Sequence, residues 1–170
     1  MDYVLILLAA LLRIFPHPPN VTPVAALALF GGAYLSRRFA LVYPLVIMAL
    51  SDLVLNPFYG VPPVIPESFF VYGSFLITGS LGLWCRSRRS IGILYLATVV
   101  SSIQFYLITN FGTWLVGILY PRTLSGLLQC YIYALPFFRM SLIGDLFWFS
   151  ILLGGYHLSH RLLVRGRLSA

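Results

Sequence analysis

The 170-residue chain is 60% hydrophobic and only 9% charged, with a mean hydropathy of +0.94. Because soluble domains carry about a quarter charged residues, these values exclude an ordinary soluble domain and indicate an integral membrane protein. Eleven arginines and four acidic residues give a net charge of +7. The basic residues lie in short breaks between apolar runs, so the charge indicates orientation in the membrane rather than nucleic-acid binding.

Six apolar stretches are candidate transmembrane helices. They cover residues 3–15, 21–36, 39–56, 68–85, 91–119 and 141–160. At about 20 residues per span they fill the chain, so we expect one transmembrane domain over residues 1–170 and no separate soluble domain. The first stretch lacks a cleavage signal and is expected to remain as a span. Prolines including Pro16 and Pro18 separate it from the second stretch and predict a tight helical hairpin.

Arginines in three of the breaks predict the topology. They are Arg37, Arg38, Arg86, Arg88, Arg89, Arg161, Arg165 and Arg167. Short arginine-rich loops stay in the cytoplasm, so these three sites should lie on one side of the membrane. Six spans with both termini in the cytoplasm satisfy this condition. The expected fold is therefore an all-α bundle of six transmembrane helices.

The last outer connection, residues 120–139, is apolar enough to enter the membrane but contains Pro136. A seventh span there would place the C-terminal arginines on the other side. We therefore expect a short interfacial or re-entrant helix in this loop.

Three ionisable residues fall inside the apolar stretches, where a charge costs about 2.5–3.5 kcal/mol at a helix centre. The topology places Arg13, Asp52 and Asp145 in the outer third, close to Asn110 and to Arg139 at the mouth of the last span. Two interpretations stay open and are compatible. Arg13 pairs with one of the aspartates to lock the bundle, or these groups line a ligand pocket under the outer loops.

Aromatic residues gather near the outer face as well. They form an interfacial belt, or Trp114 and Tyr131 stack on a planar ligand. The candidate ligand-binding residues are Arg13, Asp52, Asn110, Trp114, Tyr131, Arg139 and Asp145.

Small residues concentrate in the second stretch, where Ala28 and Gly32 lie four residues apart. This spacing allows close helix contact. It serves packing within the bundle, or it provides a docking face for a partner membrane protein.

No pattern of a catalytic site is evident. The chain lacks an HExxH motif, a paired-glutamate motif and a glycine-rich phosphate loop, and its two cysteines exclude a multi-cysteine metal site. A nucleophile such as Ser125 or Cys130 would support only a minor enzymatic interpretation. We expect no enzyme activity, no cofactor and no metal.

Four segments carry a family resemblance. They are RIFPHPPNVTPVAALALFGGAYL (13–35), SDLVL (51–55), TNFGTWL (109–115) and YPRTLSGLLQCYIYALPFFRMSLIGDLFWFSILLGG (120–155). Together they resemble an uncharacterised family of small bacterial integral membrane proteins. That family is similar, more distantly, to the substrate-binding S components of energy-coupling factor (ECF) vitamin transporters.

The resemblance implies six spans, cytoplasmic termini and a ligand site capped by the outer loops. It also implies capture of a vitamin-like solute and docking on an ECF-type coupling subunit with two ATPases. S components commonly carry an alanine pair four apart on the first span, whereas here Ala9 is followed by Arg13. A solitary transporter therefore stays open.

The predicted function is binding of a small micronutrient for uptake through the cell's inner (cytoplasmic) membrane. The expected partners are the lipid bilayer, a small-molecule ligand and the coupling subunit that the resemblance implies, but no nucleic acid. The alternative is an envelope scaffold or assembly protein similar in size and span number to the cell-shape protein MreD.

Overall fold

A computed structural model describes residues 21–62, 64–88 and 90–168, and all the regular structure in these residues is helical. The elements in chain order are α2 (Val24–Phe30), the π-helix η1 (Gly31–Leu35), α3 (Arg37–Leu41), α4 (Tyr43–Phe58), α5 (Glu67–Cys85), α6 (Ile91–Val116) and α7 (Leu124–Leu168). Proline, glutamate and glycine residues mark two of the helix boundaries. Pro66 precedes α5 and Glu67 begins it, where an acidic side chain suits the positive helix end. Gly60, with φ of 72°, follows α4 in a left-handed conformation that favours glycine.

Four helical segments of the described chain are long and apolar enough to cross a membrane. They are Arg37–Phe58, Glu67–Cys85, Ile91–Val116 and Leu124–His160. The segment Val24–Leu35 is apolar but shorter. The chain is therefore a multi-pass membrane protein. The predicted first span, residues 3–15, lies outside the described residues, so the count of six stays a prediction.

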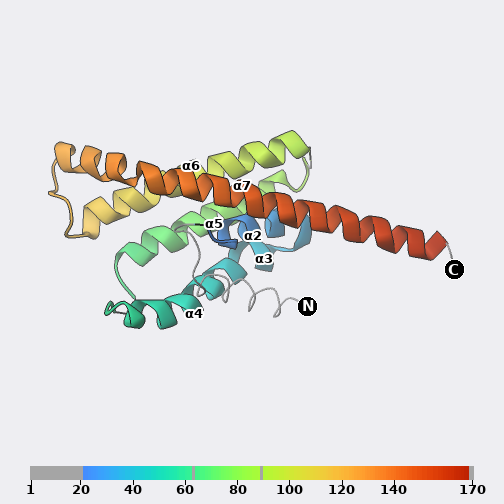
Figure 1. Cartoon of the computed structure of the whole chain (residues 1–170), viewed down its shortest axis with the longest axis horizontal. Helices are drawn as coiled ribbons and strands as arrows, with labels where there is room; N and C mark the ends of the chain where they lie inside the picture. Colours follow the sequence, from blue (N-terminus) through green and yellow to red (C-terminus); the bar gives the residue numbers. More distant parts are fainter. Residues whose placement is uncertain (1–20, 63, 89, 169–170) are drawn as a thin grey trace.

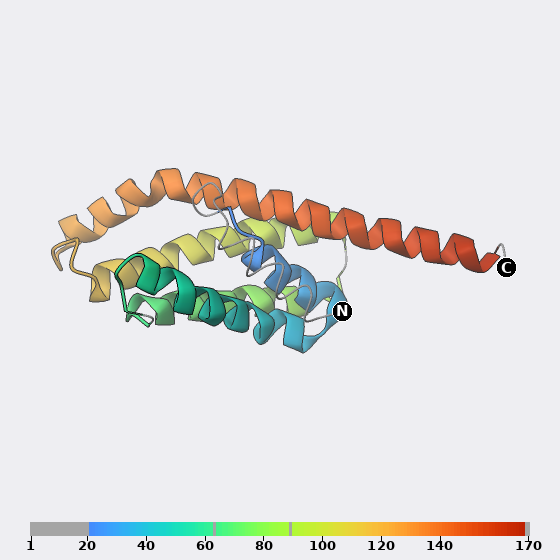
Figure 2. The same ribbon diagram turned by 60° about the horizontal axis from the view of Figure 1, so that its bottom comes forward.

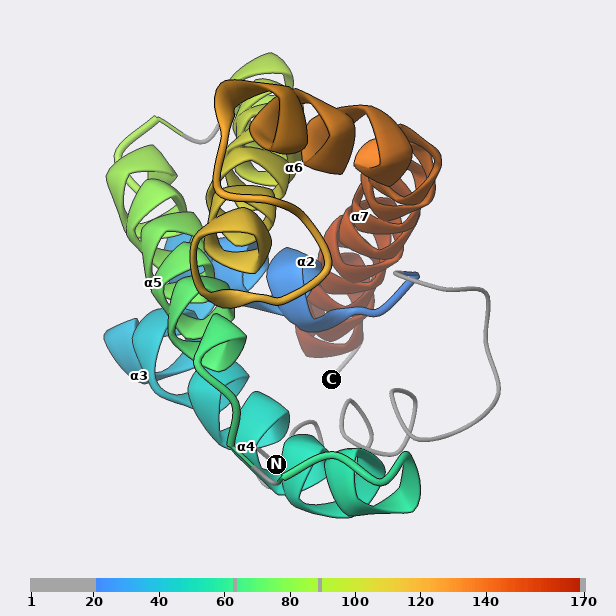
Figure 3. The ribbon, with the colours of Figure 1, turned by 90° about the vertical axis from the view of Figure 1, so that its left-hand side faces the viewer.

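Helix α2 lies at the centre of the described bundle and contacts α4, α5, α6 and α7. Figure 3, which looks along the bundle, shows the longer helices arranged around it. Two apolar cores meet at α2. One is Val24, Leu27, Ile47, Met48 and Phe75, and the other includes Leu29, Phe30, Leu94, Phe149 and Leu153. Helix α6 packs against both α5 and α7, as Figure 1 shows.

Glycines allow α2, η1 and α3 to approach α5 closely. A Cβ on Gly32 would lie 2.6 Å from the backbone nitrogen of Leu83, and one on Gly82 would collide with the carbonyl oxygen of Leu29. Ala28 is fully buried. The face that carries Ala28 and Gly32 is therefore packed inside the chain, and the described structure leaves no open surface there for a partner.

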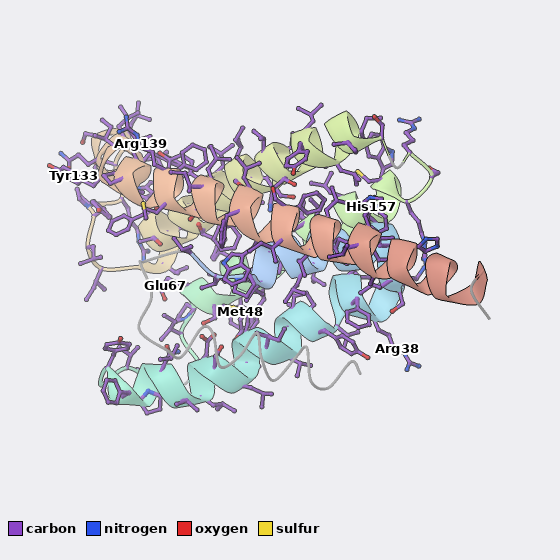
Figure 4. The ribbon with its side chains drawn as sticks, turned by 45° about the vertical axis from the view of Figure 1, so that its right-hand side comes forward. Arg38, Met48, Glu67, Tyr133, Arg139 and His157 are labelled. Carbon is purple, nitrogen blue, oxygen red and sulfur yellow. The ribbon has the colours of Figure 1, made fainter. Side chains whose placement is uncertain are left out.

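Two of the arginine-rich breaks, residues 36–38 and 86–88, follow helix ends that are joined by a hydrogen bond. The Arg86 guanidinium donates from Nη2 to the Leu35 carbonyl oxygen at 2.8 Å, which joins the end of α5 to the end of η1. In Figure 4, Arg38 and His157 lie toward one end of the bundle and Tyr133 and Arg139 toward the other. The cytoplasmic position of the arginine-rich breaks stays a prediction.

Helix α7 differs from the expectation for the last outer loop. It runs from Leu124 to Leu168 as one helix with Pro136 inside it, so the short interfacial or re-entrant helix expected in residues 120–139 is not a separate element. A proline removes only one backbone donor, and membrane helices accommodate it by local adjustment. Figure 2 shows α7 curved in its first part and extending beyond the other described helices. Asp145 consequently lies about 30 Å along this helix from Leu124, and its bond to Ser102 places it level with the middle of α6 (Ile91–Val116) rather than in the outer third.

Candidate functional site

A cavity of about 200 Å³ lies between α6 and the first half of α7. Its polar lining residues are Ser102, Thr109, Asn110 and Ser141, and the others are Phe105, Tyr106, Ala134, Phe137 and Phe138. The α6 residues fall between the middle of that helix and its end at Val116. The cavity therefore lies in the half of the bundle that borders the 117–123 connection, the half expected to face outward.

Two crossed hydrogen bonds fasten the aromatic wall of the cavity. Tyr106 donates its hydroxyl to the carbonyl oxygen of Tyr131 at 2.6 Å, and Tyr131 donates its own to the carbonyl oxygen of Leu107 at 2.8 Å. The Tyr106 ring also lies against Phe138, with 4.8 Å between the ring centroids. Because each tyrosine bonds the backbone of the other helix, the two walls keep a fixed separation.

Asn110 supplies an amide to the polar wall. Its side-chain nitrogen donates to the carbonyl oxygen of Tyr106 at 2.8 Å, and the Cys130 thiol donates to the Asn110 backbone oxygen at 3.4 Å. The amide oxygen of Asn110 lies 4.0 Å from the same sulfur, a weak contact. This oxygen can therefore accept a stronger hydrogen bond from a molecule in the cavity.

Asp145 is hydrogen-bonded to Ser102, which lines the cavity. The Ser102 hydroxyl donates to Oδ2 of Asp145 at 2.7 Å and also lies 3.1 Å from the carbonyl oxygen of Thr98. Asp145 is 8% exposed and Ser102 only 1%. Within residues 21–62, 64–88 and 90–160, the Ser102 bond is the only side-chain hydrogen bond to Asp145, and no arginine or histidine forms an ion pair with it. A carboxylate can accept about four hydrogen bonds, so the Asp145 carboxylate receives fewer than it can accept.

Asp52 belongs to a different helix pair. It is buried on α4 and accepts a hydrogen bond of 2.8 Å from the hydroxyl of Tyr72 on α5. Neither residue lines the α6–α7 cavity. The proposed partner Arg13 lies outside the described residues, so an ion pair that includes it stays a prediction.

The remaining candidates have other positions. Trp114 donates its indole N–H to the Pro121 carbonyl oxygen at 3.0 Å and so fastens the loop between α6 and α7. Arg139 is exposed on α7. Of the seven candidate ligand residues, the structure places Asn110 in the cavity wall, Tyr131 in the bonds that fasten it, and Asp145 behind it.

Ser102 and Tyr106 were not among the sequence candidates for the site. A signal for them exists, because Ser102, Tyr106 and Thr109 recur at helical spacing and place polar groups on one face of an otherwise apolar span. In the described part of the chain, no group of three or more His, Cys, Asp or Glu side chains could hold a metal ion.

The sequence matches the model of a known protein family. The chain belongs to DUF6580, a family of unknown function whose model matches residues 2–165. Among the curated proteins and the solved structures, nothing matches it.

Proposed function

We propose that this member of the DUF6580 family binds a small, micronutrient-like solute in the α6–α7 cavity, as a step in uptake through the inner membrane. The observation that carries the proposal is the cavity itself, which combines an aromatic wall, four polar side chains and a buried carboxylate behind Ser102. Such a site suits a molecule with a flat apolar body and a few hydrogen-bonding groups.

The position of Asp145 supports a role in solute passage. Ionisable residues inside transmembrane segments are costly and commonly mark a substrate or ion pathway. Asp145 lies within the candidate span Leu124–His160 and accepts a hydrogen bond from Ser102, which lines the cavity. A purely structural carboxylate would be expected to have more complete hydrogen bonding than the single bond from Ser102.

The sequence resemblance to S components favours capture on the outer side and movement driven by a coupling subunit with ATPases. The four long apolar helices and the cavity in the predicted outer half are compatible with that mode of transport. Docking through Ala28 and Gly32 is not supported, because this face is buried against α5. We propose that a coupling subunit contacts the lipid-facing sides of the bundle instead.

The test is thermal unfolding of the purified full-length protein in detergent with a panel of vitamins and related micronutrients. A ligand that binds only the native state raises the midpoint of unfolding. Ala134→Phe, which fills the cavity, should abolish the shift. The matched control is Ile132→Phe, which adds a ring to the same helix at an exposed position outside the cavity lining and should keep it. No shift with any compound, or an equal shift in both variants, would contradict the proposal.

The alternative is an envelope scaffold similar to MreD, which would use the small-residue face of the second apolar stretch and the cytoplasmic arginines to bind partners. Burial of Ala28 and Gly32 within the chain argues against docking through the small-residue face. A scaffold would also tolerate Ala134→Phe without a change in uptake of any solute.

A further inference from the structure

Ser102 presents a hydrogen-bond acceptor to the α6–α7 cavity. Its hydroxyl carries one hydrogen, which points to Asp145 Oδ2 at 2.7 Å or to the Thr98 carbonyl oxygen at 3.1 Å. Both choices leave lone pairs of the Ser102 oxygen for a donor that arrives from the cavity. A solute N–H can bond this oxygen, whereas a solute carbonyl or carboxylate finds no hydrogen there.

The negative charge of Asp145, whose carboxylate is hydrogen-bonded to Ser102, favours a cation in the cavity. Asp145 is nine-tenths buried, and no described arginine or histidine pairs with it. A donor bonded to Ser102 would lie roughly 5 Å from the carboxylate, because two hydrogen bonds of about 3 Å would meet at an angle at the Ser102 oxygen. Because screening is weak at a buried position, opposite charges at this distance attract strongly and like charges repel.

The aromatic lining of the cavity also favours a cation. Phe105, Tyr106, Phe137 and Phe138 line the cavity, and aromatic faces attract cations within about 6 Å of their centres. The rings also provide apolar contact for the body of the solute. No arginine or histidine lines the cavity among the described residues, so the lining offers an anionic group no positively charged partner.

We infer that the solute is a small organic cation whose ammonium N–H donates to Ser102 Oγ in front of Asp145. This inference rests on the proposed function and specifies the class of solute. The amide oxygen of Asn110 accepts a second donor at the other end of the cavity.

The experiment uses three probes of one shape, which are benzylamine, benzyl alcohol and benzoate. Each is titrated into the purified full-length protein in detergent, and the midpoint of thermal unfolding gives its affinity. Ala134→Phe is titrated in parallel, so that uptake of the probes by detergent can be subtracted. We expect benzylamine to bind on the order of tenfold or more tightly than benzyl alcohol, and benzoate not to bind.

Asp145→Asn keeps the side-chain shape and removes the charge, so it should eliminate the preference for benzylamine over benzyl alcohol. Glu67→Gln removes a carboxylate from the start of α5, outside the cavity lining, and should keep the preference. The comparison of the three probes in the wild-type protein remains decisive if Asp145→Asn does not fold.

Equal binding of benzylamine and benzyl alcohol, tighter binding of benzoate, or an unchanged preference in Asp145→Asn would overturn the inference. If a micronutrient still stabilises the wild type but not Ala134→Phe, the proposed function survives that result. If neither the probes nor any micronutrient distinguishes wild type from Ala134→Phe, both proposals fail.

Discussion

The hydroxyl of Ser102 donates a hydrogen bond of 2.7 Å to the carboxylate of Asp145 and so joins the middle of α6 to α7 beside a cavity. A second pair of the same chemistry joins α4 to α5, where Tyr72 donates to Asp52 at 2.8 Å. Each buried aspartate of the described spans thus accepts a hydrogen bond from a neighbouring helix. Since a bond to a carboxylate is stronger inside a membrane protein than in water, these pairs should help to fix the helix arrangement.

Ser102→Ala should lower the free energy of unfolding by about 1–3 kcal/mol, because Asp145 loses its hydrogen-bond donor while it stays buried. The measurement is chemical or thermal unfolding in detergent. Ser80→Ala is the control, since Ser80 is exposed and bonds only the Leu76 carbonyl oxygen of its own helix. Its expected effect is within about 0.5 kcal/mol. Equal effects of the two substitutions would show that the Asp145 bond contributes nothing.

Tyr72→Phe tests the other pair. The substitution removes one donor to the buried carboxylate of Asp52 and should cost about 1.5–3 kcal/mol in the same unfolding measurement. Tyr133→Phe removes a hydroxyl from an exposed tyrosine of α7 and should be close to neutral. A neutral Tyr72→Phe would mean that the hydroxyl bond is replaced without loss.

Gly82→Ala should destabilise the protein by about 1–3 kcal/mol, because the added Cβ would meet the backbone of Leu29 and push α2 away from α5. The matched control lies on the same helix. A Cβ at Gly73 meets nothing within 4 Å, so Gly73→Ala should be neutral or stabilise the helix by up to about 1 kcal/mol. If both variants behave alike in thermal unfolding, the close approach of α2 and α5 is contradicted.

The topology is tested with single cysteines. In a background of Cys85→Ala and Cys130→Ala, Val64→Cys lies in the exposed α4–α5 connection and Ser87→Cys in the exposed α5–α6 connection. A membrane-impermeant thiol reagent should label residue 64 in intact spheroplasts and residue 87 only after the membrane is opened. Labelling of both sites from the same side would contradict the predicted topology and the predicted outward-facing position of the cavity.

Much of the helix pattern could be predicted from the sequence, since apolar runs and their breaks are properties of consecutive residues. The predicted stretch 68–85 coincides with α5 to within one residue, and 91–119 begins where α6 begins. The last stretch was predicted too short, because Pro136 was taken to interrupt a helix that in fact continues through it. Local preference is outweighed there by the packing of α7 along α6.

The sequence by itself indicated that the chain enters a membrane and that Asp52 and Asp145 need partners, and it predicts that the arginine-rich breaks share one side. These conclusions follow from hydropathy and charge, which depend on composition along the chain and not on its folding. Only the tertiary structure decided that Tyr72 and Ser102 are those partners and that Asn110 faces a cavity while Trp114 fastens a loop. The reason is geometric, because the rotation and depth at which two helices pack select the hydroxyl that meets a carboxylate, and many hydroxyls in the sequence look alike.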